Sequence, residues 1–116
     1  MRTIETEELE RMLGGNEDMV LVNVLDSASF EKEHIPGSHH VPNSDPNLVM
    51  EVTRLAGAKD RRVVVYCSNP KCHASPEAGR KLEDAGFTNV LHYPGGMEGW
   101  KLAGYAVEHG APPHVK

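Results

Sequence analysis

A chain of 116 residues has the size of one domain, and its 39% apolar and 25% charged residues suit one core with a solvated surface. Its formal net charge of −5 argues against a general nucleic-acid binder, which normally carries a basic surface. The longest apolar runs, at 19–22 and 63–67, are far too short to span a membrane. Glutamates at 5, 7, 8 and 10 stand where a signal peptide needs apolar residues, so we expect a cytoplasmic protein.

Helical and strand patterns alternate along the first half of the chain. Thr6 is a predicted N-cap for a short amphipathic helix that stops at Gly14. Residues 20–25 form a nearly continuous apolar run, which is typical of a strand buried on both faces of a parallel sheet. A brief helical turn is expected at 29–33. Residues 41–42 make a short edge strand at best, because proline cannot donate to a ladder.

The second half continues the alternation. Apolar spacing predicts a helix over 46–56, and the β-branched run at 63–66 is the best candidate for the central strand. Ser75, followed by proline, is a predicted N-cap for a helix that Gly86 ends. A further strand is expected at 89–93.

A turn or helix around Trp100 closes the pattern, with the indole expected in the core. The tail from Gly110 onward, with two prolines and no apolar pattern, is expected to be loosely held. Alternating strands and crossover helices imply an α/β fold: a central, mostly parallel sheet with helices on both faces, forming one domain over residues 1–116.

Cys67 lies at the most informative position in the chain. It follows the strongest strand and precedes a helix, and ligands of such sheets bind beyond the carboxyl ends of the strands. A loop that curls between a strand and a helix turns backbone N–H groups toward one centre, which favours a thiolate and an incoming oxyanion. Lys71 and His73 add positive charge. This pattern suits covalent sulfur or phosphoryl transfer, although a lone cysteine after an apolar strand is more often a small buried side chain.

Four blocks of the sequence resemble, in order, the motifs of the rhodanese-like domain family of single-domain sulfurtransferases. They are residues 21–25, residues 34–38 with 41–42, residues 64–67, and residues 85–90 with 95–100. The resemblance implies that Cys67 takes a sulfane sulfur from a donor such as thiosulfate or polysulfide. The resulting persulfide would pass it to cyanide, a thiol or an acceptor protein. Backbone amides from Ser68 to Ala74 would hold the outer sulfur, in a substrate-binding loop of Ser68, Asn69, Pro70, Lys71, Cys72, His73, Ala74 and Ser75.

The loop departs from the family pattern. Ser75 stands eight positions after Cys67, about two more than usual, no arginine is present, and Pro70 replaces a glycine. Asn23 and Leu25 replace the aspartate and arginine usual in the first-strand motif. We therefore expect a wider and less cationic pocket, which leaves the identity of the donor open.

Cys72 brings a second thiol into the lengthened loop. Two cysteines five positions apart across a curled loop can approach disulfide distance. One hypothesis makes Cys72 a resolving thiol that attacks a Cys67 persulfide or sulfenate and forms an internal disulfide. The alternative is that Cys72 only packs against the loop. A structural disulfide is not expected in a reducing compartment.

Seven histidines raise the question of a metal. Cys67, Cys72, His73, His39 and His40 could supply ligands, but paired C-x₂-C or H-x₃-H spacings do not occur. We therefore expect neither a metal nor a cofactor. His39 and His40 are expected at the surface.

Two further polar residues receive structural roles. His34 is interpreted as the histidine of the H-I-P-G turn, with its ring tied to the backbone. Asp26 is interpreted as a solvated turn residue after the first strand.

Three functions compete at this stage. The leading hypothesis is sulfur transfer between a small sulfur compound and a thiol, cyanide or protein acceptor, without nucleic acid or membrane as partner. The second is a catalytically idle module that acts in binding or redox regulation. The third, an oxyanion reductase or phosphatase, is disfavoured because Ala74 stands where such enzymes need an arginine.

Overall fold

The computed structural model describes residues 1–15 and 17–110. Strands and helices alternate over this range, and most of the tail predicted to be loosely held lies outside the described residues. The elements are β1 (Arg2–Thr3), α1 (Thr6–Gly14), β2 (Met19–Asn23), α2 (Ser27–Lys32), β3 (His39–His40), α3 (Leu48–Ala56), β4 (Arg62–Tyr66), α4 (Ala74–Asp84), β5 (Val90–Tyr93) and α5 (Gly96–Leu102).

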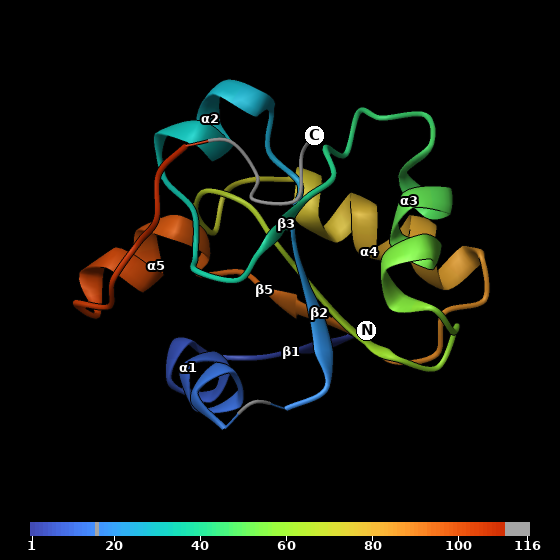
Figure 1. The fold of residues 1–116 in the computed structure, drawn as a ribbon, viewed down its shortest axis with the longest axis horizontal. Coiled ribbons are helices and arrows are strands. Elements are labelled where there is room, and N and C mark those ends of the chain that lie inside the picture. Colours follow the sequence, from blue (N-terminus) through green and yellow to red (C-terminus); the bar gives the residue numbers. More distant parts are fainter. Residues whose placement is uncertain (16, 111–116) are drawn as a thin grey trace.

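The strands form one five-stranded sheet in the order β1-β5-β4-β2-β3, and every pairing among them is parallel (Figure 1). The predicted α/β fold is confirmed, and β4 is the central strand as expected. Val64 in the middle of β4 pairs with Leu21 of β2 and Leu91 of β5. The carboxyl end of β4 is therefore flanked on both sides, which positions whatever follows Tyr66.

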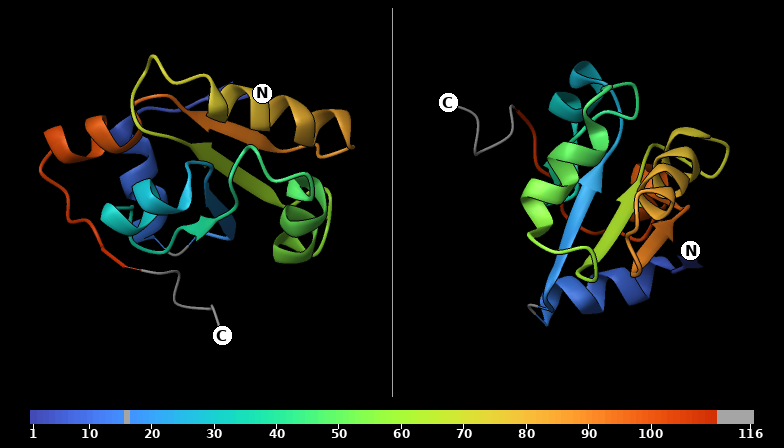
Figure 2. Two further views of the ribbon diagram at one scale, coloured as in Figure 1. Left: turned by 90° about the horizontal axis from the view of Figure 1, so that it is seen from above. Right: turned by 90° about the vertical axis from the view of Figure 1, so that its right-hand side faces the viewer.

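The two faces of the sheet carry separate apolar clusters. Alternation along β4 sends Val63 and Val65 to one face and Val64 and Tyr66 to the other. Buried residues of α3 and α4 pack on the first face, and those of α1 and α5 pack on the second. Figure 2 shows α4 lying along β4 and β5. Since Cys67 belongs to the first cluster, its side chain lies on the face that α4 covers.

Two predicted N-caps are wrong for the same physical reason. Glu5 and His73 occupy the N-cap positions of α1 and α4 without a capping side-chain hydrogen bond, so Thr6 and Ser75 lie inside the first turns. The Thr6 hydroxyl forms a hydrogen bond of 2.7 Å with the Tyr93 hydroxyl instead. The Ser75 hydroxyl likewise has partners outside its own helix. Both side chains are of types that favour capping a helix N-terminus, but here their hydroxyls form hydrogen bonds with residues outside the helix instead.

The edge strands also differ from the sequence prediction. β1 was not predicted, since two exposed residues carry no periodicity. At the other edge, β3 is His39–His40 and ends before the predicted residues 41–42. Both histidines are half-buried, so their expected surface position is wrong. The His40 ring stacks on Phe30, with centroids 4.7 Å apart.

A buried polar network ties the turn after α2 to the sheet. The Tyr66 hydroxyl lies 3.0 Å from each of three partners: Asn23 Nδ2, the Ile35 N–H and Ser38 Oγ. Asn23 also accepts the Leu25 N–H through Oδ1 at 2.9 Å. Asparagine suits this place because it donates and accepts at once. Burial, as the largest effect, raises the pKa of Tyr66.

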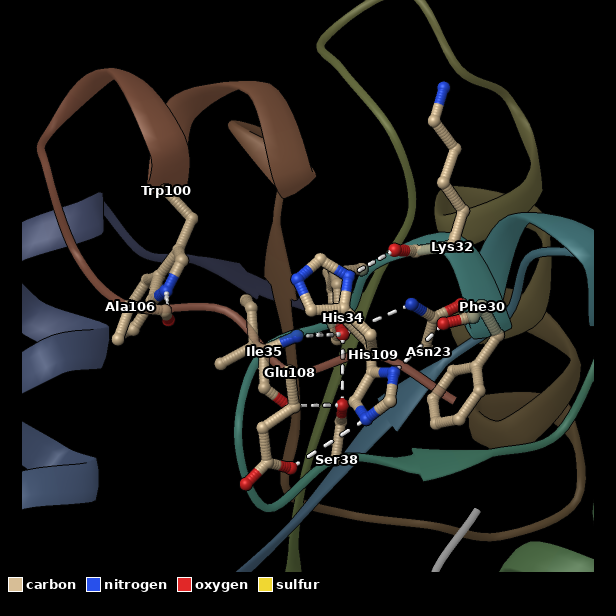
Figure 3. A network of polar contacts seen from close by, with 11 residues as sticks. Asn23, Phe30, Lys32, His34, Ile35, Ser38, Trp100, Ala106, Glu108 and His109 are labelled. Atoms are coloured by element: carbon tan, nitrogen blue, oxygen red, sulfur yellow. Dashed lines mark hydrogen bonds and ion pairs between the residues drawn. The ribbon is translucent and has the colours of Figure 1, made fainter. Parts of the chain in front are cut away.

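The histidine of the H-I-P-G turn is held as predicted. His34 Nδ1 forms a 2.8 Å hydrogen bond with the Phe30 carbonyl, and the two rings stack at 3.8 Å. Figure 3 shows the ring reaching Phe30 on one side and Glu108 on the other. Trp100 is buried on the second face, as expected, and donates Nε1–H to the Ala106 carbonyl at 2.8 Å. These contacts connect the turn after α2 and the helix α5 to residues 106–108.

Candidate active site

Cys67 follows β4 directly and is 2% exposed. The backbone around it is held by the start of α5. The Met97 N–H donates to the Cys67 carbonyl at 3.0 Å, and the Glu98 N–H donates to the Ser68 carbonyl at 2.8 Å. Gly96 precedes these donors with φ of +62°, and a Cβ on it would lie 2.6 Å from the Cys67 carbonyl oxygen. Only glycine allows this close approach of two backbones.

Cys67 and Cys72 are joined by a disulfide, with their Cα atoms 6.5 Å apart. Asn69 shapes the turn between them: its carbonyl accepts the Cys72 N–H at 3.0 Å, and its Oδ1 accepts the Lys71 N–H at 2.9 Å. Two of the six backbone N–H groups between Ser68 and Ala74, the segment expected to hold an outer sulfur, are thus engaged within the loop in this disulfide state. Cys72 is half-buried and packs against the first apolar cluster.

Ser75 connects Cys67 to a residue that the sequence analysis did not single out. Ser75 Oγ lies 3.3 Å from Cys67 Sγ and 2.8 Å from His92 Nε2. Ser75 is 1% exposed, and burial lowers the pKa of His92. His92 pairs in register with Val65 on β4. A histidine at that register faces α4 with Val65, and this is the signal that could have found it.

The outer side of the loop carries few charges. Lys71 and His73 are exposed, and a hollow of about 340 Å³ beside the loop is lined by Asn69, Pro70, Lys71 and Glu98. One basic and one acidic side chain face this hollow. The fixed positive charge that an arginine would supply is absent from the loop.

The other polar residues of the sequence analysis lie elsewhere. His40 Nε2 forms a hydrogen bond of 2.7 Å with the Leu25 carbonyl. Asp26 is exposed and caps α2 by accepting the Ser29 N–H at 2.8 Å, and this backbone hydrogen bond lowers the pKa of its carboxyl. Within residues 1–15 and 17–110, no three His, Cys, Asp or Glu side chains gather as a metal-binding group.

The fold, the turn and the cysteine at the strand end can now be compared with known proteins. Residues 5–103 match the sequence model of the rhodanese-like domain. The chain belongs to this family. None of its described helices is long and apolar enough to cross a membrane.

Proteins similar in sequence to this rhodanese-like domain include a protein named as a regulator and others named as sulfurtransferases. It is 36% identical over 95 residues to an HTH-type transcriptional regulator of Mycobacterium tuberculosis, covering 82% of this chain and 40% of the regulator. It is 31% identical over 98 residues to the probable adenylyltransferase/sulfurtransferase MoeZ of the same species, covering 84% of this chain but 24% of MoeZ. The thiosulfate sulfurtransferase GlpE of Stutzerimonas stutzeri is 33% identical over 87 residues, which is 74% of this chain and 73% of GlpE. The chain therefore spans well under half of the first two relatives.

A solved structure agrees with the family assignment. The thiosulfate sulfurtransferase from Pseudomonas aeruginosa superposes with a TM-score of 0.86 at 28% identity, over 97% of this chain and 21% of that one. The fold is thus shared with proteins named as sulfurtransferases.

Proposed function

We propose that this rhodanese-like domain is a sulfurtransferase that carries sulfane sulfur on Cys67. One observation carries the proposal: Cys67 directly follows the central strand, in a loop whose second cysteine is joined to it by a disulfide. Family membership and relatives named thiosulfate sulfurtransferase support it.

Loading begins with the Cys67 thiolate. It attacks the sulfane sulfur of the donor, the S–S bond of the donor breaks, and sulfite or a shortened polysulfide leaves with the electron pair. The product is a Cys67 persulfide. An acceptor thiolate or cyanide then attacks the outer sulfur, and Cys67 leaves as the thiolate. No metal or cofactor enters this sequence of steps.

Cys72 provides a second way out of the persulfide. Its thiolate attacks Cys67 Sγ, the bond between Sγ and the outer sulfur breaks, and hydrosulfide leaves. The outer sulfur gains two electrons, and the two cysteines lose them as the disulfide forms. The Cα separation of 6.5 Å falls within the range that disulfides occupy. A dithiol reductant returns the loop to its starting state.

The loop favours an uncharged or weakly charged donor over thiosulfate. A dianion such as thiosulfate needs fixed positive charge, and the basic Lys71 shares its hollow with the acidic Glu98. We therefore expect a low-molecular-weight organic persulfide, whose sulfur carries at most one negative charge, to load Cys67 faster than thiosulfate does.

Intact mass spectrometry tests the proposal. The reduced Cys72→Ser protein, treated with polysulfide, is expected to gain one sulfur atom, about 32 Da, and to keep it because no resolving thiol remains. The wild type is expected to release hydrosulfide and lose two protons in forming the disulfide. The double variant Cys67→Ser/Cys72→Ser is the matched control and should gain nothing, because no thiol remains. Absence of any adduct on Cys72→Ser with polysulfide, persulfide and thiosulfate would contradict sulfur transfer.

A second function is favoured by the same disulfide and by the relative named as a transcriptional regulator. Here the domain senses oxidants, and the Cys67–Cys72 bond is the signal. The two functions differ in their dependence on sulfane sulfur. A sensor forms the disulfide with peroxide as readily as with polysulfide, whereas the sulfurtransferase forms it with release of hydrosulfide.

A further inference from the structure

The hydrogen-bonded series Cys67–Ser75–His92 joins three elements at one point of the sheet. Cys67 directly follows β4, Ser75 lies in the first turn of α4 and His92 lies in β5. The two distances, 3.3 Å from Sγ to Oγ and 2.8 Å from Oγ to Nε2, are hydrogen-bond distances for these atoms. Ser75 is buried, so water does not compete freely for its hydroxyl.

From this geometry we propose that His92, acting through the Ser75 hydroxyl, receives the proton of the Cys67 thiol and so supplies the thiolate. The inference rests on the proposed function, because the thiolate is the species that attacks the sulfur donor. In the step, the Cys67 S–H proton passes to Ser75 Oγ while the Ser75 proton passes to His92 Nε2. Serine remains a hydroxyl, cysteine becomes a thiolate and His92 becomes an imidazolium, so charge and protons balance.

The arrangement after the transfer stabilises the thiolate. The imidazolium donates Nε2–H to Ser75 Oγ, and the Ser75 hydroxyl donates to the Cys67 sulfur. Burial lowers the pKa of His92, so the ring is neutral before the transfer. The imidazolium formed in the step is stabilised by its hydrogen bond to Ser75 Oγ and by the thiolate charge beyond it.

The charged groups around His92 are directed elsewhere. β1 and β4 place Thr3 and Val65 in register beside it, and neither titrates. Cys67 is the titratable side chain that shares Ser75 with it. On the neighbouring segments, three charged pairs form ion pairs: the Met1 amine with Glu83, Arg2 with Glu8, and Arg62 with Glu17. On α4, Glu77 and Lys81 form hydrogen bonds with Asn43. Arg80 and Asp84 are exposed to solvent. Lys71 and His73, in the loop, are exposed as well.

The role proposed for His92 differs from that of an ordinary packing residue in one measurable way. A packing residue affects stability, whereas this histidine sets the acidity of a sulfur atom two hydrogen bonds away. Glutamine in its place keeps a polar group near Ser75 but cannot take a proton. The test therefore uses two substitutions. Ser75→Ala removes the hydroxyl that connects Cys67 to His92, and His92→Gln removes the imidazole that accepts the proton.

The experiment measures the rate of Cys67 alkylation by iodoacetamide as a function of pH, by intact mass, in the reduced Cys72→Ser protein. In this background Cys67 is the single thiol. Ser75→Ala and His92→Gln should each lower the rate at pH 7 by about tenfold and move the midpoint to higher pH, since each removes a hydrogen bond to the charged form. The double variant should fall no further than the single ones, because both act on one unit. His40→Gln is the matched control, since His40 is also half-buried and hydrogen-bonded, but to the Leu25 carbonyl.

Each outcome has a definite reading. Alkylation profiles of Ser75→Ala and His92→Gln that superimpose on that of Cys72→Ser overturn the relay, and so do additive losses in the double variant. If one variant fails to fold, the other still decides. Treating the same proteins with polysulfide separates the two proposals. A shifted alkylation profile without a sulfur adduct retains the relay and rejects sulfur transfer, whereas an adduct with unshifted profiles does the reverse.

Discussion

At the scale of single residues, a buried hydrogen-bond network centred on Tyr66 connects β4 to the turn after α2. The Tyr66 hydroxyl has three partners, and Asn23 engages both ends of its amide. Such buried networks are costly when one member is removed, because the remaining groups lose their partners away from water. They lie on the second face of the sheet, so they support β4 from the side opposite Cys67.

Removal of that hydroxyl gives a residue-scale prediction. Tyr66→Phe leaves the Ile35 N–H and the Asn23 amide without an acceptor, and should lower the free energy of unfolding by about 2 kcal/mol. Urea unfolding followed by circular dichroism measures it. Tyr105→Phe is the control, because Tyr105 is half-buried against Trp100 and lies outside this network. Equal effects of the two substitutions would contradict the assigned role of the network.

A second residue-scale prediction concerns Asp26. Its carboxyl accepts the Ser29 N–H at the start of α2, and this backbone hydrogen bond lowers its pKa from the usual 3.8. A group whose pKa is depressed by folding stabilises the native state above the unfolded value, and this contribution is lost as pH falls through the folded pKa. Asp26→Ala should therefore destabilise the protein at pH 7 but leave it nearly unchanged in strong acid. Thermal unfolding across pH, with Asp60→Ala as control, measures the effect. A pH-independent difference would argue against the cap.

At the scale of elements, α5 acts as a clamp on the cysteine loop. Its first amides bind the carbonyls of Cys67 and Ser68, and Gly96 permits the contact. The loop is thus fixed by backbone groups at its start and by the disulfide and α4 at its end. Side chains of the loop can vary in sequence without loss of this support, because the contacts to α5 are made by backbone groups.

Gly96→Ala tests the clamp. The new Cβ would meet the Cys67 carbonyl at 2.6 Å, so the loop must move and persulfide formation should fall at least tenfold, with a loss of stability of about 1–3 kcal/mol from the left-handed backbone. Gly104→Ala is a matched control: its φ is +85°, and nothing lies within 4 Å of its Cβ. It should show the backbone cost with normal sulfur loading. Normal loading in Gly96→Ala would show that the loop does not depend on α5.

At the scale of the whole molecule, the disulfide closes only a short ring. The sequence separation of 5 predicts that it restricts the unfolded chain modestly, by about 2 kcal/mol. Urea unfolding with and without a reductant should show that difference in the wild type and none in Cys72→Ser. A protein that unfolds on reduction would assign the bond a structural rather than a redox role.

Much of this molecule could be predicted from its sequence, since the responsible signals are local. The β-branched run of β4 and the apolar spacing of α3 and α4 depend on residues close in the chain, and they gave the α/β fold and the position of Cys67. Ser75 and Thr6 were assigned as caps because their chemistry favours it, and partners from β5 took their hydroxyls instead. His92 was not predicted as a site residue, because its contact with Ser75 depends on which strand pairs with β4. That information is not local.

The contact between α5 and the cysteine loop also bears on how the protein is made. Synthesis proceeds from the N-terminus at about 5–20 residues per second, so both cysteines leave the ribosome before Met97 and Glu98. Until then the carbonyls of Cys67 and Ser68 have no α5 amides to bind. During synthesis there is therefore an interval in which both thiols are present but the backbone contacts from α5 are not yet formed. Oxidation during that interval would form the disulfide before the loop has its final shape.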